Sequence, residues 1–453
     1  MKYIVFSMAA VFGVPIMTAL GLSFSFFRQL LMAALVASTA LGQKIRINFV
    51  SYELYRGPDR GFEFAATDLI GLAIILVILI RSRSKISWFP SNITWIFLFY
   101  LSSFFSVINA PEPLFFGFSI LKLSRSVVLF WCCVNYFRTE ENIDGLFYGM
   151  VSASLIVTYF AFIQKYLFGI YRVPGSFDHS NTIPPFLNMM LPIIIIWSLT
   201  DESFPFWKRV LGVVSILGSI FSVASTFSRA GLALSLACVG ASLLYVLIKK
   251  PSFRVYVFSG FLAVAVIAGM IKAADSFLER IRTAPKSSEE ARDEFNEAAN
   301  KMAKDYFFGV GLNNYSVVLT RVEKYRENVE VMAGEEEAGV CHHIYWLTAA
   351  EMGFPGLIIF IIMIGRFCWL FLYSSVCSKE LPWLLTAGIL IGQSSLHLSG
   401  FLEWAFRQTP VLNLFFILSG AAIGIIDRPQ IEEDDESAYS DLDDELYEDS
   451  QYY

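Results

Sequence analysis

Apolar stretches of about 20 residues recur along almost the whole sequence, and they constrain the fold more than any other feature. A helix crosses the hydrocarbon core of a bilayer in roughly 20 residues. The chain is 56% hydrophobic and only 16% charged, which is extreme for a soluble domain. We therefore predict an all-α polytopic membrane bundle of 12–13 transmembrane helices, with 12 if the first two runs form one re-entrant unit. The predicted spans are 4–22, 27–42, 66–81, 92–109, 121–137, 146–167, 182–199, 209–225, 229–248, 254–272, 344–373, 382–400 and 411–427.

Short loops rich in lysine and arginine predict orientation, because cytoplasmic loops carry an excess of both residues. Three such loops are predicted to be cytoplasmic: 81–85, 208–209 and 249–254. The long segment 273–343 then faces the other side, which is the periplasm if the chain lies in a bacterial inner membrane. The loop 43–65 is expected there too, although it carries Arg56 and Arg60. Two external arginines need an anionic partner or a salt bridge.

This orientation divides the chain into four predicted parts: an N-terminal transmembrane bundle (1–272), a periplasmic loop domain (273–343), C-terminal transmembrane helices (344–427) and a cytoplasmic tail (428–453). The loop domain contains SSEEARDEFNEAANKMAKDYF, which predicts an amphipathic helix. Its apolar stripe would consist of Phe295, Ala298, Met302 and Phe307.

The tail is strongly acidic. The net charge of the chain is −6, and residues 427–453 alone hold twelve Asp or Glu and one Arg. Such a low-complexity segment cannot bury a core, so it is interpreted as disordered. A docking tail for a basic partner is the alternative.

Two of the four histidines stand side by side in CHHIYWLTAAEMGFPG, residues 341–356, at the mouth of a predicted span. An imidazole exchanges a proton near neutral pH, so His342 is the candidate reacting group; the alternative is a histidine that only hydrogen-bonds at the interface. In one continuous helix Glu351 would point away from His342, and we expect it to be a support deeper down. His343 is not expected to share a metal with His342, since adjacent helical residues diverge by about 100°. No cysteine spacing indicates a metal site.

Arginines on three external segments are candidates for binding an anion. Arg229 begins a predicted span, where the helix dipole and the guanidinium both favour phosphate; the alternative is an arginine that snorkels to the interface. Arg292 lies on the amphipathic helix; the alternative is that it is only a charge on the protein surface. Arg172 lies in YRVPGSFDHSNTIPP, where Asp178–His179 is interpreted as a turn before Pro184 rather than as an acid–base pair.

A last external segment, FLEWAFRQT, carries Glu403 and Arg407. These two residues would either reach the same chamber as His342 or pair with each other.

The order of these motifs, GSFDHSNTIP, FSRAG, GVGLNNY and HHIYWLTAAEMGFPG, resembles the O-antigen ligase/O-antigen polymerase superfamily of bacterial membrane glycosyltransferases over about residues 170–425. The hallmark of that family is His-Asn followed by Glu-x-Gly nine residues after the histidine. His342, Glu351 and Gly353 match it, while His343 stands where asparagine is usual.

Two arginine motifs match less closely. Ser228–Arg229 fits, with Ala230 before the glycine, and Arg292 fits, although Asn296 replaces a frequent aromatic residue.

The resemblance implies an inverting transfer that uses neither a metal nor a cofactor. The donor would be a glycan on undecaprenyl diphosphate, and the acceptor a saccharide hydroxyl, either lipid-linked or on the lipid A core. His342 would be the base, Arg229, Arg292 and Arg172 would hold the diphosphate, and Arg56 and Arg60 are reserve candidates. Glu351, His343 and Glu403 would support them. Membrane lipids and polysaccharide-assembly proteins are the expected partners, and no nucleic acid is expected.

Several functions stay open at this point. Within the family the chain is a ligase, a polymerase or a protein O-oligosaccharyltransferase. Outside the family it is a transporter of lipid-linked glycans, for which no inverted repeat is visible, or a scaffold for polysaccharide export that would use the acidic tail and not His342.

Overall fold

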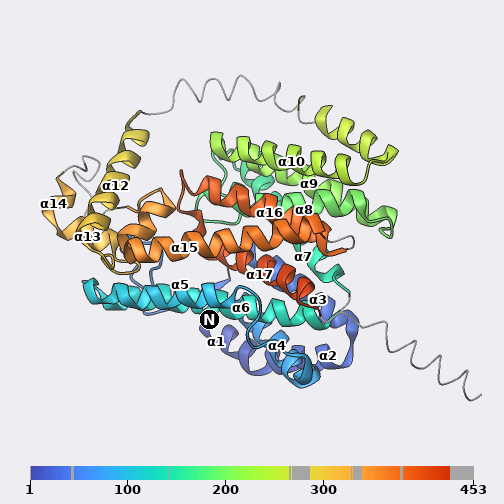
Figure 1. Ribbon diagram of the computed structural model, residues 1–453, viewed down its shortest axis with the longest axis horizontal. Coiled ribbons are helices and arrows are strands. Elements are labelled where there is room, and N and C mark those ends of the chain that lie inside the picture. The colour runs from blue at the N-terminus through green and yellow to red at the C-terminus, as the bar shows by residue number, and fades with distance from the viewer. Residues whose placement is uncertain are drawn as a thin grey trace, which may run out of the picture.

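The computed structural model describes residues 2–41, 45–140, 142–264, 267, 286–327, 329, 339–377 and 381–428, and helices make up most of them (Figure 1). Each predicted span falls on a helix where the structure describes it, which confirms the all-α class; most of 265–272, the end of the span 254–272, lies outside the described residues. The first two runs form separate helices that meet at Phe24. The acidic tail from 429 onward lies outside the described residues.

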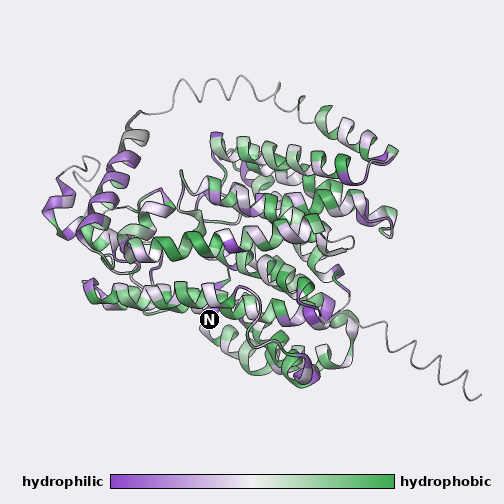
Figure 2. Cartoon of the chain, viewed as in Figure 1, coloured by the Kyte–Doolittle hydropathy of each residue, from purple (hydrophilic) through white to green (hydrophobic). Residues whose placement is uncertain are grey.

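Eight helices in the described part of the chain are long and apolar enough to cross a membrane by length and composition. They are Lys2–Ser23 (α1 Lys2–Met8, η1 Ala9–Gly13 and α2 Val14–Ser23), α6 (Pro113–Thr139), α7 (Asp144–Tyr166), Ser180–Thr200 (η4 Ser180–Thr182 and α8 Ile183–Thr200), α9 (Phe206–Ser225), α10 (Arg229–Lys249), α15 (Ile344–Cys377) and α17 (Thr409–Ile426). The other predicted spans fall on α3 (Ser25–Thr39), α4 (Ala66–Arg81), α5 (Ile93–Phe105), the helix Phe253–Val264 and α16 (Leu381–Ser399). Apolar residues, green in Figure 2, occur along the length of these helices.

Pairs of glycines let neighbouring helices approach closely at the centre of the bundle. On α17, a Cβ added at Gly420 would lie 2.6 Å from the carbonyl oxygen of Phe130, and one at Gly424 would lie 2.3 Å from that of Val134. On α16, the same addition at Gly392 would lie 2.7 Å from the Met189 carbonyl of α8. In an apolar environment, this close backbone packing supplies much of the attraction between helices.

The bundle has two chemically different ends, which α6 connects. This 27-residue helix is about 40 Å long. Near its start, Lys122 pairs with Asp59 at 2.5 Å. Beyond its other end, Glu140 pairs with Arg28 and with Arg81 of a predicted cytoplasmic loop. The basic loop and the Asp59 region therefore lie at opposite ends of the bundle.

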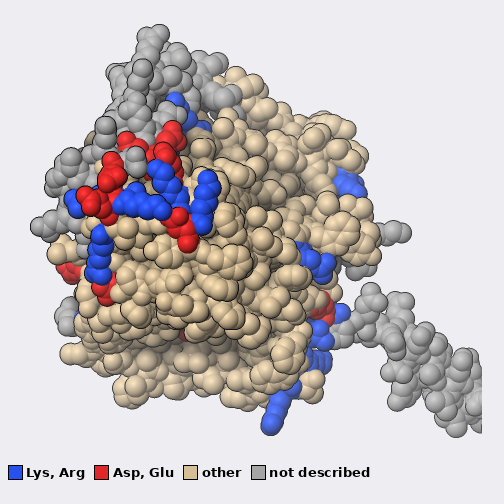
Figure 3. Space-filling view, turned by 60° about the vertical axis from the view of Figure 1, so that its left-hand side comes forward, with Lys and Arg blue, Asp and Glu red and all other residues tan. Residues whose placement is uncertain are grey.

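The loop domain packs against the Asp59 end. It contains α12 (Lys286–Asp305), α13 (Tyr315–Arg321) and α14 (Glu323–Arg326), and charged side chains gather there on an otherwise largely uncharged face (Figure 3). The predicted amphipathic helix is confirmed, and its stripe residues Phe295, Ala298 and Met302 are buried. The prediction for Phe307 was wrong: α12 has ended before it, and its side chain is 65% exposed.

The described part of the loop predicted to be external, residues 45–65, contains an antiparallel hairpin. Strand β1 (Arg46–Phe49) pairs with β2 (Phe62–Ala65), with Arg46 opposite Ala65. We call residues 50–61, which connect the two strands, the hairpin loop.

Candidate active site

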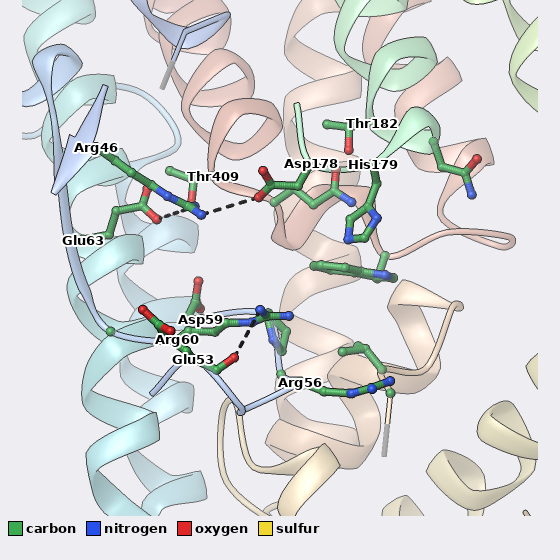
Figure 4. Close-up of a pocket in the computed structure, with 18 of the residues that line it drawn as sticks. Arg46, Glu53, Arg56, Asp59, Arg60, Glu63, Asp178, His179, Thr182 and Thr409 are labelled. Carbon is green, nitrogen blue, oxygen red and sulfur yellow. Dashed lines mark hydrogen bonds and ion pairs between the residues drawn. The ribbon is translucent and has the colours of Figure 1, made fainter. Parts of the chain in front are cut away.

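A polar chamber of about 1030 Å³ lies where the hairpin meets three other segments. The hairpin (46–63) contributes more lining residues than any other segment, and the rest come from 172–182, 339–342 and 403–409 (Figure 4). This volume is at the upper end of the range for ligand sites, about 300–1000 Å³. The chamber therefore has room for more than one sugar unit.

Glu403 joins two candidate residues, His342 and Arg292, to Asn181 at one wall of the chamber. Its Oε2 lies 3.3 Å from Nδ1 of His342. Its Oε1 accepts hydrogen bonds from Nη2 of Arg292 at 3.0 Å and from Nδ2 of Asn181 at 2.7 Å. A carboxylate only accepts, so the hydrogen between Glu403 and His342 belongs to Nδ1. The Nε2 atom of a neutral His342 then carries the lone pair that can take a proton.

Asn181 extends these contacts to a fourth segment. Its Oδ1 accepts from Nη2 of Arg172 at 2.8 Å, and Nε of Arg172 donates to the carbonyl of Thr226 at 3.3 Å. Thr226 belongs to the turn between α9 and α10. A continuous path of hydrogen bonds therefore leads from that turn through Arg172 and Asn181 to Glu403.

His343 caps the helix that follows it. Nδ1 of His343 accepts from the backbone N–H of Trp346 at 3.3 Å, and the His343 carbonyl accepts from Leu347 at 2.9 Å. Asparagine is a favoured residue at such N-cap positions, so histidine here performs the task expected of the asparagine usual in the family. Burial lowers the pKa of His343 below its usual value, which keeps Nδ1 available as an acceptor.

His342 and Glu351 are not on one continuous helix, in contrast to the arrangement considered from the sequence. His342 precedes α15, and the helix is broken at Gly353, whose φ is 72° and ψ is 177°. Glu351 is fully buried and pairs with Arg407 at 2.5 Å. Arg407 thus pairs with Glu351 and not with Glu403, and Glu351 lies outside the chamber lining.

The break in α15 is closed by the GVG turn of the loop domain. The backbone N–H of Val310 donates to the carbonyl of Ala350 at 2.8 Å, and that of Gly311 donates to the carbonyl of Glu351 at 3.0 Å. These bonds satisfy carbonyls that the break would leave without helical partners. A Cβ at Gly353 would lie 1.9 Å from the carbonyl oxygen of Phe307, so only glycine fits. The Glu-x-Gly motif and the GVG turn form one joint.

Contacts with Lys122 and Asn313 hold the hairpin loop in place. Asp59 pairs with Lys122, and Nδ2 of Asn313 donates to the Asp59 carbonyl at 2.9 Å. Tyr55 is 3% exposed, donates to the Asn313 carbonyl and packs on Phe115 with ring centroids 4.1 Å apart.

Arg46, on β1, pairs with Glu63 at 3.0 Å and with Asp178 at 3.5 Å. Burial raises the pKa of Glu63, while the guanidinium groups of Arg46 and Arg125 lower it.

The predicted site residues fall in three groups. His342, Arg172 and Glu403 line the chamber, as do the reserve candidates Arg56 and Arg60. Arg292 reaches the chamber wall through Glu403. Arg229 is exposed at the start of α10 and is not part of the lining; it lies three residues from Thr226, the partner of Arg172.

The lining residues that sequence reasoning missed include Arg46, Asn181 and Trp404. Asn181 lies inside the quoted GSFDHSNTIP motif, so that motif contained a signal for it. His179 lines the chamber, and its carbonyl accepts from the N–H of Thr182 at 3.1 Å, the turn predicted there. In the described residues, no group of three or more His, Cys, Asp and Glu is arranged to hold a metal ion.

Residues 211–361 match the family model of O-antigen ligase. Over these residues, about a third of its length, the chain is similar to O-antigen ligase. No curated protein matches it. The matched segment includes Arg229, Arg292 and His342. The hairpin, Arg172 and Glu403 lie outside it, so two parts of the chain, one inside and one outside the match, build the chamber together.

Proposed function

We propose that the chain transfers a glycan from a lipid diphosphate to a hydroxyl of an acceptor saccharide in the chamber. The observation that carries this proposal is the position of Glu403, which contacts both His342 and Arg292 and reaches Arg172 through Asn181. A base and two guanidinium groups therefore lie at one wall of one cavity, in a chain whose residues 211–361 match O-antigen ligase.

The reaction needs two functions from the protein, because a sugar diphosphate is already activated. The acceptor oxygen forms a bond to the anomeric carbon, while the bond from that carbon to the phosphate oxygen breaks and its electron pair leaves with the diphosphate. The hydroxyl proton goes to Nε2 of His342. Arg172 and Arg292 would stabilise the charge on the departing diphosphate. Arg229, three residues from Thr226, is a third candidate for this role. Attack opposite the leaving group inverts the anomeric carbon.

The proposed location is a bacterial inner membrane, with the chamber on the periplasmic side. The support is the distribution of basic loops, since Arg81 belongs to the end of the bundle opposite the chamber. The donor is then proposed to be a glycan on undecaprenyl diphosphate. The acceptor is either the lipid A core, which makes the chain a ligase, or a second lipid-linked unit, which makes it a polymerase.

Purified protein in detergent, given a lipid-diphosphate-linked glycan and an acceptor saccharide, tests the proposal. We expect His342→Ala to slow transfer by about 10²–10⁴-fold, with folding and membrane insertion unchanged. The control is Glu327→Gln, an exposed glutamate of the loop domain outside the chamber lining. Near-normal transfer by His342→Ala would rule out its role as the base.

In cells, the accumulated lipid-linked product separates the alternatives. Single capped units accumulate when a polymerase is missing, and long unligated chains accumulate when a ligase is missing.

A further inference from the structure

We propose that Trp404 binds the sugar of the donor, with its indole stacked on the pyranose ring that carries the reacting anomeric carbon. The inference rests on the proposed function, because it assigns the residue that recognises the sugar in the same reaction. In that reaction the arginines hold the diphosphate and His342 acts on the acceptor hydroxyl, so the sugar itself needs a further residue. Trp404 lies outside the segment 211–361 that matches O-antigen ligase.

The first observation is the chemical character of the lining. Most residues that line the chamber are charged or polar. Among the described lining residues, Trp404 alone carries an aromatic side chain other than histidine. A pyranose ring has hydroxyls around its edge and C–H bonds on its faces. The hydroxyls match the polar lining, and the C–H bonds match the electron-rich face of an indole ring.

The second observation is the neighbour of Trp404 in the chain. Glu403 lies 3.3 Å from His342 and 3.0 Å from Arg292. During transfer, the anomeric carbon lies between the attacking hydroxyl, whose proton goes to His342, and the departing diphosphate, which the arginines hold. The sugar that carries this carbon therefore lies at the wall that Glu403 builds. Trp404, the next residue, belongs to the same wall.

The third observation is that the backbone at Trp404 is fixed. Trp404 directly precedes η6 (Ala405–Arg407), and its carbonyl accepts a hydrogen bond from the N–H of Arg407 at 2.9 Å. Arg407 is buried in its pair with Glu351, and the two residues after Trp404 are 1% and 4% exposed. Trp404 is half-buried, since it packs on the hydrophobic core and also lines the chamber. A residue held in this way loses little entropy when a ligand binds.

The other aromatic residues of this segment pack on rings of the protein. Phe401 packs on Tyr345 with ring centroids 4.8 Å apart, and Phe406 packs on Phe415 with ring centroids 5.0 Å apart. Neither Phe401 nor Phe406 is part of the described chamber lining. Trp404 is therefore the aromatic residue of FLEWAFRQT that a sugar in the chamber can reach.

The test compares two ligands of the purified full chain: the lipid-diphosphate-linked glycan isolated from host membranes, and the same lipid diphosphate without its glycan. Isothermal titration calorimetry in detergent measures the binding of each ligand without an acceptor, and transfer assays then give the donor and acceptor KM. The variants are Trp404→Leu, which keeps an apolar side chain without a ring, and Trp404→Phe, which keeps a ring. The control is Trp369→Leu, at a tryptophan of α15 that is 58% exposed and does not line the chamber.

We expect Trp404→Leu to weaken the binding of the glycan-bearing lipid about tenfold, the effect of losing roughly 50–60 Å² of apolar contact. Its affinity for the sugar-free lipid should stay within about twofold of wild type, because the arginines that hold the diphosphate are unchanged. Trp404→Phe should lose about threefold or less, since the smaller ring still stacks. The donor KM should follow the affinity, and the acceptor KM should stay within about twofold.

An equal loss of affinity for both lipids in Trp404→Leu would mean that Trp404 only holds the wall around Glu403 in place, and this result overturns the inference. Unchanged affinity for the glycan-bearing lipid, or a rise confined to the acceptor KM, overturns it as well. A wild-type protein that binds the donor but transfers no glycan refutes the proposed function. The binding comparison needs no transfer, so it still decides whether Trp404 binds the sugar.

Discussion

Replacing Glu403 with glutamine should change which nitrogen of His342 carries its hydrogen, with little change in shape. In the native chain, Glu403 Oε1 accepts from Asn181 and Arg292, and Oε2 faces Nδ1 of His342. A glutamine must direct its oxygen toward the two donors, Asn181 and Arg292. Its NH₂ group then points at Nδ1 of His342 and requires that atom to be an acceptor. The neutral imidazole would carry its hydrogen on Nε2, where the proposed base needs a lone pair.

The size of the effect follows from the contact. Glu403 is 16% exposed and His342 is 31% exposed, so the pair is only partly screened by water. A hydrogen bond to a charged group contributes about 1.5–3 kcal/mol. At about 1.4 kcal/mol per factor of ten, Glu403→Gln should lower kcat about 10–150-fold. The donor KM should change little, because the bonds from Asn181 and Arg292 are retained.

The assay is the initial rate of glycan transfer over a range of donor concentrations, with Glu327→Gln as the control. Glu403→Ala provides a second comparison: it also removes the partner of Arg292, so the donor KM should rise in addition to the loss in kcat. A Glu403→Gln protein with wild-type kcat would refute the assignment of Glu403 as the residue that sets the hydrogen position of His342. If the donor KM rises and kcat does not change, the role of Glu403 is only to hold Arg292 in place.

Three further predictions concern the supports of the site. His343→Ala should lower the free energy of unfolding by about 0.5–2 kcal/mol through loss of the cap, whereas His343→Asn should keep it. The pKa of His343 is lower in the folded than in the unfolded chain, so the unfolded state binds more protons and the free energy of unfolding should fall as the pH drops below about 6.5. Thermal unfolding of His343→Asn should lack this acid sensitivity. If both proteins lose the same stability at low pH, the assignment to His343 is wrong. Glu351→Ala leaves Arg407 buried without a partner and should cost about 3–5 kcal/mol in detergent unfolding; an unchanged melting temperature argues against the buried pair. Gly353→Ala should prevent the turn after α12 from packing against α15, so limited proteolysis should cut the loop domain faster. The control is Gly365→Ala, where an added Cβ meets nothing within 4 Å.

The fold was predictable because its signals are local. The length of an apolar run places a helix, and each predicted span falls on one within the described residues. The amphipathic stripe of α12 followed from a period of 3.6 residues, and it failed only at Phe307, where the helix has already ended. The motif order within 170–425 was enough to indicate the superfamily.

The site was predictable only in part, because its contacts join residues far apart in the chain. His342, Arg172 and Glu403 were named from the sequence, and all three line the chamber. Arg229 was predicted from a motif in the same way, but it does not line the chamber. A motif places a residue at the start of a helix, and it does not tell which other segments pack beside that residue.

The sequence by itself determined the membrane-spanning class, the places of the helices and the resemblance to O-antigen ligase, because hydrophobic length and short motifs depend on neighbours in the chain. Only the tertiary structure decided which charges meet. It paired Arg407 with Glu351 and left Glu403 for His342 and Arg292. It also turned Arg56 and Arg60 from an exception in a loop into one wall of the chamber. Charge pairing depends on distance in space, which the order of residues does not contain.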